Sequence, residues 1–374
     1  MSETTLPTPA TVIKIIGVGG AGGNAVNHMA PNGPSTFEFI CANTDAQALS
    51  NTRTEQRIQL GESGLGAGSD PMVGRESAIR ERALIAEALK GADMVFITAG
   101  MGGGTGTGAA PVVAEVAREL GILTLGVVSK PFEFEGPRRM RVAEEGIATL
   151  ARCVDSLIIV LNSRLEEVLG DDVTQKQAFA AADEVLSKAV TGIAEIIAVP
   201  GMINVDFEDV RTVMRQTGMA MMGSAQHAGD ERAVKAAEEA IACPLLDGAN
   251  LRAARGVLVN IAASEESLKL RETKLVMNTI CAQTNEDAII KFGAVFDETL
   301  GDAMRVTVVA TGLNRPGDLS LATRRPVISR AGSLPQPGMR QGANHALPRP
   351  IAAQHELRVG GLSRQSARPE EDDQ

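Results

Sequence analysis

Two glycine-rich segments carry the residues best suited to chemistry in this sequence. The first, GVGGAG at 17–22, has the spacing G-x-G-x-x-G and directly follows a short apolar run. Glycine lets the backbone approach a phosphate closely, and a helix that starts there offers free N–H groups and the positive end of its dipole. Taken alone, this spacing fits a dinucleotide, another phosphate ligand or a tight turn between strand and helix. Asp45 even lies about where a dinucleotide enzyme places the acid that binds ribose.

The second segment, MGGGTGTG at 101–108, separates these alternatives. It also links an apolar run to a helical pattern, and a nicotinamide-dependent oxidoreductase has no use for it. Two such loops can surround a polyphosphate with backbone N–H groups and with the hydroxyls of Thr105 and Thr107. The sequence contains no G-x-x-x-x-G-K-[ST], so it is not a P-loop protein. The pair of loops therefore favours a nucleoside triphosphate as the ligand.

The acidic segment NVDFED at 204–209 is the third candidate. Asp206 and Asp209 are three residues apart and lie on one side of a helix if one begins here. They could complement the positive end of that helix dipole, which would make their role structural. They could also act on a ligand, and the spacing alone leaves both interpretations open.

Strand and helix patterns alternate around the glycine segments, which predicts an α/β fold with a doubly wound parallel sheet and helices on both faces. In such sheets ligands bind outside the carboxyl ends of the strands, where both glycine segments lie. The predicted strands are 11–18, 37–42, 93–99, 122–129 and 156–161, and the predicted helices start near 24 or span 74–90, 109–120 and 137–150.

The second half of the chain predicts a long central helix and a smaller α/β domain. Residues 171–199 form an uninterrupted helical pattern with apolar residues on several sides, as expected of a helix packed between two layers. A short helix starts near Asp206, and strands at 256–262, 288–295 and 304–310 follow, alternating with helices. Residues 1–10 and 314–374 are predicted to be disordered. The second of these segments holds seven of the seventeen prolines and nine Arg against six acidic residues.

Composition excludes several classes of protein. The formal charge of -10 argues against broad electrostatic binding of nucleic acid. The four cysteines are far apart without CxxC spacing, which is typical of reduced thiols in a cytosolic protein. No apolar run approaches the length of a membrane helix and the N-terminus has no signal-peptide pattern, so we expect a cytoplasmic protein without direct membrane insertion.

Several stretches together resemble the FtsZ family of the tubulin superfamily, whose signature is GGGTGTG. The resemblance covers 11–313, about four fifths of the chain. Besides the two loops, the matching stretches include NTDAQAL (43–49), PFEFEG (131–136), PGMINVDFEDVRTVM (200–214), ARGVLVNI (254–261) and RVTVVATG (305–312). It implies a GTP-binding domain at 11–170, a central helix at 171–203 and a C-terminal GTPase-activating domain at 204–313.

The resemblance also implies roles for individual residues. Asp183 would read the guanine edge, and Glu135 and Arg139 would contact ribose and phosphate. Asn43 and Asp45 would lie near the phosphates and Mg²⁺, although a structural role in a turn fits them equally. The remaining implied nucleotide contacts are Gly20, Ala21, Gly22, Gly23, Asn24, Gly104, Thr105, Gly106 and Thr107.

The resemblance implies that the acidic segment works in a neighbouring subunit. One subunit would bind GTP, and the next would bring Asn204, Asp206 and Asp209 to the γ-phosphate to orient the attacking water, with Mg²⁺ offsetting charge. Such a contact joins two different faces and builds an open head-to-tail filament, here a homopolymer. The expected activity is hydrolysis of GTP to GDP and phosphate in a cytokinetic ring at the division site.

The end of the sequence departs from the family pattern. Division proteins of this family usually end in a short apolar and basic peptide that binds membrane adaptors, whereas this chain ends in GGLSRQSARPEEDDQ. One interpretation is an ordinary division protein with a diverged end. The other, which we favour at this point, is an accessory paralogue that co-assembles with a second FtsZ. A non-hydrolysing structural filament is a further alternative, disfavoured by the acids at 206 and 209.

Overall fold

We describe a computed structural model of the chain, covering residues 11–31, 33–34, 36–170, 172–198, 201–216, 218–243 and 251–313. All of these residues belong to the first of two units into which the chain divides, residues 1–324. The predictions of disorder for 1–10 and 314–374 lie outside the described residues. No described helix is long and apolar enough to cross a membrane.

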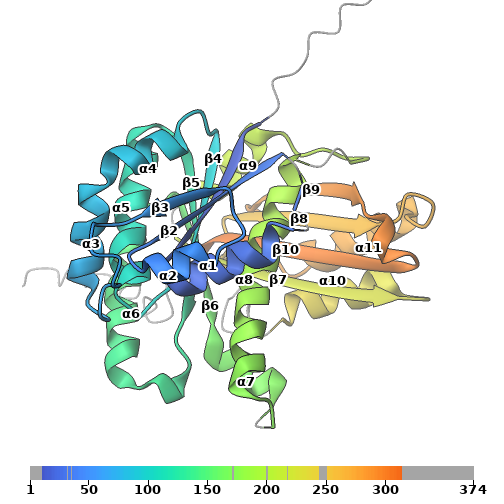
Figure 1. Ribbon diagram of the computed structural model, residues 1–374. Coiled ribbons are helices and arrows are strands. Elements are labelled where there is room, and N and C mark those ends of the chain that lie inside the picture. Colours follow the sequence, from blue (N-terminus) through green and yellow to red (C-terminus); the bar gives the residue numbers. More distant parts are fainter. Residues whose placement is uncertain are drawn as a thin grey trace, which may run out of the picture. The chain divides into compact units, whose positions relative to one another are not determined.

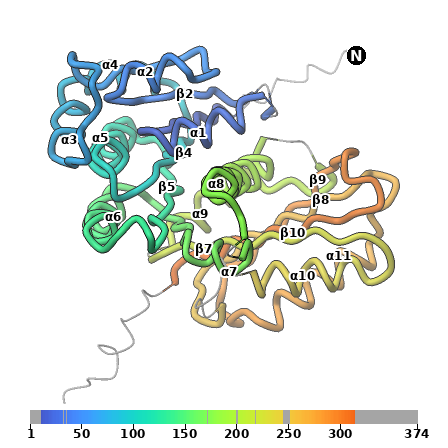
Figure 2. Tube along the Cα trace, turned by 60° about the horizontal axis from the view of Figure 1, so that its bottom comes forward, coloured from blue at the N-terminus to red at the C-terminus, as the bar shows by residue number. Residues whose placement is uncertain are grey.

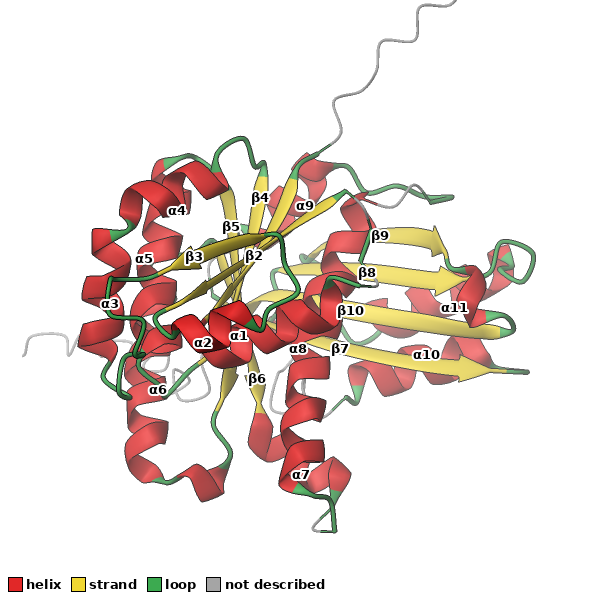
Figure 3. Cartoon of the chain, viewed as in Figure 1, coloured by secondary structure: helices red, strands yellow, loops and turns green. Residues whose placement is uncertain are grey.

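The first half of the chain forms a parallel sheet flanked by helices, as the alternating pattern predicts (Figures 1 and 3). Its strands have the spatial order β3-β2-β1-β4-β5-β6. The connection reverses direction between β1 and β4, so the loops that follow these two strands lie next to each other. The elements are β1 Ile13–Val18, α1 Gly19–Met29, β2 Phe37–Asn43, α2 Ala46–Ser50, β3 Gln56–Gln59, α3 Pro71–Arg80, α4 Arg82–Leu89, β4 Met94–Gly100, α5 Thr105–Glu119, β5 Leu123–Lys130, the 3₁₀ turn η1 Glu133–Glu135, α6 Pro137–Leu150 and β6 Ser156–Leu161.

Helices cover both faces of this sheet because successive residues of a strand point to opposite sides. Ile15 and Phe96 belong to the core on the face covered by α1 and α8 (Gln175–Ala198). Ile16 and Ile97, one residue further on, belong to the core on the other face, beneath α4, α5 and α6. Both faces are therefore buried, which accounts for the nearly continuous apolar strands seen in the sequence.

The second half of the chain continues the same sheet with four more strands in the order β7-β10-β8-β9. Ile158 of β6 pairs with Ala220 of β7 in parallel, β10 is antiparallel to both β7 and β8, and β9 is parallel to β8. One hydrogen-bonded sheet includes all ten strands, so the sheet does not mark where one domain ends and the next begins. The predicted domain boundaries therefore stay predictions. The elements are α7 Asn162–Leu169, α8, α9 Phe207–Met214, β7 Met219–Ala228, α10 Arg232–Ile241, η2 Leu251–Ala253, β8 Gly256–Ala263, α11 Leu270–Cys281, β9 Ile289–Phe296, η3 Glu298–Leu300 and β10 Ala303–Leu313.

Helix α8 lies between the two groups of strands, as Figure 2 shows. Leu186, Val190 and Ile193 of α8 belong to one core that also contains Leu125 of β5 and Leu258 of β8. The predicted long central helix is confirmed, with its described part beginning at Gln175 rather than at residue 171. Helices α10 and α11 pack on the opposite face of the later strands, in a separate core.

Several predicted boundaries are wrong. Helix α1 begins at Gly19 rather than near Asn24, and α5 begins at Thr105 rather than at Ala109. The helix predicted over 74–90 is two helices, because the backbone leaves helical geometry at Glu81. Strands β3 and β7 are absent from the prediction altogether, because their residues have weak strand propensity and pairing with neighbouring strands holds them in place.

Candidate functional site

Helices α1 and α5 begin beyond the carboxyl ends of β1 and β4, and their N-termini form the base of the candidate site. Neither helix has a side-chain hydrogen bond at its N-cap, and neither has an acidic residue in its first turn. The first N–H groups of a helix have no partner within the helix, and they favour an anion. The two helix ends therefore offer two adjacent sets of donors to a phosphate chain.

The glycines of these loops serve two different purposes. A methyl group added at Gly22 would lie 2.3 Å from the Thr98 carbonyl oxygen, and one at Gly106 would lie 2.4 Å from that of Gly100, so both are needed for close packing. A methyl group added at Gly19, where φ is +75°, would lie 3.0 Å from the Gly106 nitrogen, so the loops touch each other. Methyl groups at Gly20 or Gly103 would meet nothing within 4 Å. The space beside these last two glycines is open and could admit a phosphate.

Threonine hydroxyls tie the loops together. The Thr105 hydroxyl lies 2.5 Å from that of Thr44, at the end of β2. Thr107 is buried, and its Oγ1 accepts a hydrogen bond from the Gly102 N–H at 2.8 Å. Thr107 thus holds the second loop in shape by an internal hydrogen bond. Thr105, the first residue of α5, joins that loop to Thr44.

Asn43 and Asp45 have local partners in the turn after β2. Asp45 is the N-cap of α2 and accepts a hydrogen bond from the Ala48 N–H at 3.0 Å, and Asn43 Oδ1 accepts one from the Asp45 N–H at 3.2 Å. The structural role that their sequence position suggested is therefore present. Since Thr44 joins this turn to α5, the turn also lies beside the second glycine loop.

Glu135 and Arg139 form an ion pair at the start of α6. Arg139 Nε lies 3.0 Å from Glu135 Oε2, and Glu135 Oε1 accepts a hydrogen bond from the Phe132 N–H at 2.9 Å. A methyl group added at Gly102 would contact the Arg139 side chain at 2.8 Å, so this pair flanks the second loop. The glutamate is nearly buried, whereas the guanidinium is half exposed, so an anion can reach it in addition to Glu135.

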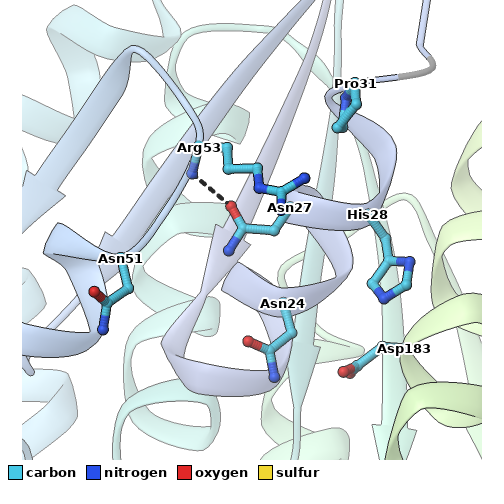
Figure 4. A pocket seen from close by; sticks show the side chains of 7 residues that line it. All are labelled: Asn24, Asn27, His28, Pro31, Asn51, Arg53 and Asp183. Carbon is cyan, nitrogen blue, oxygen red and sulfur yellow. Dashed lines mark hydrogen bonds between the residues drawn. The ribbon is translucent and has the colours of Figure 1, made fainter.

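A cleft of about 510 Å³ opens beside α1 (Figure 4). Asn24 and His28, four residues apart on α1, face Asp183 of α8 across it. The backbone N–H of Arg53 donates to Asn27 Oδ1 at 2.7 Å and closes the opposite side. The remaining lining residues are Pro31 and Asn51. All of the lining residues except Pro31 have polar side chains.

Asp183 supplies the one carboxyl among the residues that line this cleft. Burial raises its pKa from the usual value to about 6, and the Asn24 side chain and nearby His28 oppose the shift. A carboxyl with a raised pKa in a cleft is a candidate functional group, since a buried anion gains most from a ligand that donates hydrogen bonds.

The acid loop, residues 201–209, follows the far end of α8. Asp206 is the N-cap of α9 and accepts a hydrogen bond from the Asp209 N–H at 2.7 Å, and Asn204 Oδ1 accepts one from the Gly201 N–H at 2.7 Å. Ile203 pairs with Ala294 of β9, which fixes the loop against the later strands. The start of a helix at Phe207 agrees with the sequence prediction.

The structure does not bring the acid loop to the glycine loops of the same chain. Asp183 is the ninth residue of α8, and Ala198 is fifteen positions further along the helix. At 1.5 Å per residue this is roughly 22 Å. Val205 packs beside Ile196 and Gly293, so the loop stays at that end of the helix. The acids at 206 and 209 therefore lie away from the candidate site of their own chain.

Sequence reasoning missed six residues of the site. Asn27, His28, Pro31, Asn51 and Arg53 line the cleft, and Thr44 contacts Thr105. His28 is one helical turn after Asn24, and that spacing could have identified it. No local pattern indicates Arg53, which reaches the cleft only through the fold.

Comparison with known proteins places this arrangement in a family. Residues 12–170 match the Tubulin/FtsZ family, GTPase domain, and residues 218–314 match the FtsZ family, C-terminal domain. The cell division protein FtsZ of Pseudomonas aeruginosa is 57% identical over 305 residues, covering 81% of this chain and 77% of that protein. The Pseudomonas putida protein of the same name is 49% identical over 372 residues, covering 96% and 93%.

A solved structure gives the same result. The empty FtsZ dimer from M. jannaschii has a TM-score of 0.77 and 40% sequence identity, covering 81% of this chain and 88% of that one. Sequence, fold and the two glycine loops agree, and the chain belongs to the FtsZ branch of the Tubulin/FtsZ family.

Proposed function

We propose that this protein binds and hydrolyses GTP and polymerises head to tail into filaments that act in cell division. The observation that carries the proposal is the separation of the two halves of the site. The glycine loops lie at the carboxyl ends of β1 and β4, and the acid loop lies at the far end of α8. A heterologous contact between copies would join the two and extend without closing.

The nucleotide would be held by the residues around the two loops. Backbone N–H groups at the starts of α1 and α5 would meet the phosphates, with Gly20 at the open side of the cradle. Arg139 would meet a phosphate or the ribose, and Asp183 would accept hydrogen bonds from the guanine edge. Thr107 would act indirectly by holding the second loop in shape.

Mg²⁺ would arrive with the nucleotide. Among the described residues, no three His, Cys, Asp or Glu side chains gather in a way that could hold a metal. Mg²⁺ usually keeps several waters and binds substrate phosphates with one or two protein ligands. The hydroxyls of Thr44 and Thr105, which meet at the second loop, and the carboxylate of Asp45, which follows Thr44 in the chain, fit that smaller role.

The names of the relatives support a place in division. They are called cell division proteins, which favours action in the cytoplasm at the division site. We propose a second copy of this chain as the first partner. A second FtsZ and membrane adaptors of the division machinery are further candidates.

Turnover should depend on protein concentration if the site is shared. With GTP and Mg²⁺ in excess, we expect the rate per subunit to be near zero at low concentration and to rise above a threshold, as filaments appear by light scattering. A constant rate per subunit at all concentrations would contradict the shared site. The absence of any turnover would instead favour a binding-only paralogue that needs a partner.

GTP binding should weaken at low pH, because Asp183 becomes protonated. Since the pKa of this carboxyl is about 6, we expect affinity to fall about tenfold per pH unit below pH 6, as the proton displaces a hydrogen bond from guanine. The Asp183→Asn variant should bind on the order of ten- to a hundredfold more weakly and lose this pH dependence. Fluorescent nucleotide titration below the assembly threshold measures both effects.

Three further measurements isolate this carboxyl. Glu184→Gln is the matched control, because Glu184 is exposed and pairs with Lys188. His28→Gln removes the neighbouring imidazole from the cleft. In the nucleotide-free protein, folding favours protonated Asp183 between pH 3.8 and about 6, so this group lowers the free energy of unfolding as pH rises through that window. Affinity that stays constant from pH 7.5 to pH 5 would exclude Asp183 as the guanine contact.

A further inference from the structure

Lys291 of the edge strand β9 makes an ion pair with Asp209 of the acid loop. Its Nζ lies 2.7 Å from Asp209 Oδ1, and the two side chains are 37% and 34% exposed. Lys291 is the register partner of Leu258 on β8, and Leu258 belongs to the core formed with α8 and α9. The lysine therefore lies on the face of the sheet that carries the acid loop, opposite to α11.

The acids at the start of α9 each have a separate partner. Asp206 accepts the Asp209 N–H, and Glu208 lies 3.3 Å from Arg211. The ion partner of Asp209 comes instead from a different element, more than eighty residues further along the chain. The ammonium group of Lys291 thus holds one carboxylate oxygen of Asp209.

A structural interpretation of Lys291 is available. A lysine on an edge strand discourages unwanted pairing of strands, and an exposed ion pair is screened by water and contributes little to folding. The position of the ion pair indicates a further role, because Asp209 is the acid expected to meet the nucleotide of a neighbouring copy. Bringing a carboxylate toward a polyphosphate is opposed by like charge, and that repulsion grows as water leaves the junction.

We propose that Lys291 is a positioning residue of the intersubunit GTPase site. It fixes Asp209 Oδ1, leaves the second oxygen to orient water, and places a positive charge where the acid loop approaches the phosphates of the next subunit. This inference rests on the proposed function, since it requires the acid loop to act in trans. As subunits associate, the pair is desolvated and its electrostatic effect becomes larger than in the free subunit.

The test compares Lys291→Met and Lys291→Arg with wild type, measuring GTP turnover and light scattering over a range of protein concentration. We expect Lys291→Met to lower the maximal rate per assembled subunit on the order of ten- to a hundredfold, as misplaced catalytic groups do. Its assembly threshold should rise, and its affinity for GTP in the unassembled state should stay within twofold. Lys291→Arg should restore most of the rate. A merely structural pair would leave the maximal rate unchanged.

Two controls complete the design. Lys274→Met removes an exposed lysine from α11 on the opposite face and should behave as wild type. Lys291→Gln is a second neutral variant, for use if Lys291→Met unfolds. Adding Lys291→Met to Asp209→Asn should cause no further loss of turnover, because coupled residues are not additive.

The outcomes separate this inference from the function on which it rests. If Asp209→Asn loses turnover but Lys291→Met stays within twofold of wild type, the role of Lys291 is wrong and the shared site stands. Additive losses in the double variant would also overturn the role of Lys291. If Asp209→Asn itself keeps wild-type turnover, the shared site fails and the role of Lys291 fails with it.

Discussion

Replacing Asp209 by alanine should lower GTP hydrolysis on the order of a hundred- to a thousandfold and leave GTP binding within twofold of wild type. The reason is geometric: this carboxylate lies at the far end of α8, away from the glycine loops of its own chain, and so has no part in holding the nucleotide there. Phosphoryl transfer depends mainly on positioning and charge, and the loss of a group that orients water is costly. Phosphate release above the assembly threshold and nucleotide titration below it provide the two measurements.

A mixing experiment makes this prediction specific to a shared site. The second component is a Gly20→Val variant, expected to lose GTP binding because its side chain fills the open space of the cradle. Neither variant alone should hydrolyse GTP. In an equal mixture, about a quarter of head-to-tail junctions would pair an intact nucleotide site with an intact acid loop, so about a quarter of wild-type turnover should return.

Glu208→Ala is the matched control, since Glu208 is exposed and pairs with Arg211. Two inactive variants that stay inactive when mixed, although they form mixed filaments, would contradict the shared site.

Alanine at two neighbouring glycines of the first loop should have opposite effects on folding and binding. Gly22→Ala should lower the free energy of unfolding by at least about 2–3 kcal/mol, because its methyl group would lie 2.3 Å from the backbone oxygen of Thr98. Gly20→Ala should keep or slightly raise stability, since it meets nothing within 4 Å and lies within α1. The same methyl group should weaken GTP binding tenfold or more, because it enters the space proposed for the phosphates.

Denaturant unfolding without nucleotide and a separate binding titration distinguish these effects. Gly103 of the second loop also has nothing within 4 Å of an added methyl group, so Gly103→Ala should behave like Gly20→Ala. Gly121→Ala is not a suitable control, because alanine is strained at the Gly121 φ of +76°. If Gly20→Ala binds GTP as tightly as wild type, the phosphates do not lie beside that glycine, and the position of the cradle is wrong.

Some errors in the sequence prediction came from signals that were present. Asp70 and Pro71 are a cap and a first-turn residue, and they mark the start of α3 where the prediction began the helix at Gly74. The sequence prediction starts this helix too late because glycines carry no apolar periodicity, although α1 begins at Gly19. The break at Glu81 has no glycine or proline to mark it, so the pattern alone could not show it.

Other features have no local signal. Strand β7 has the sequence MAMMGSAQHA, which is poor in β-branched residues, and nine of its residues pair with β10. The cleft at Asp183 requires α1, the turn at Arg53 and α8 to meet, and the separation of the acid loop from the glycine loops depends on the length and direction of α8. The pairing of Lys291 with Asp209 joins elements that only the sheet brings together.

The sequence by itself determined the chemistry of this protein: two glycine loops after apolar strands, the threonines within the second loop, the acids at 206 and 209, and the alternation that makes a parallel sheet. These are local properties, because close backbone approach and strand burial are set by residue type and spacing over a few residues. The tertiary structure decided which residues share a site and which cannot. That outcome depends on contacts between distant segments and on a rigid helix of about 36 Å, which no short-range pattern encodes.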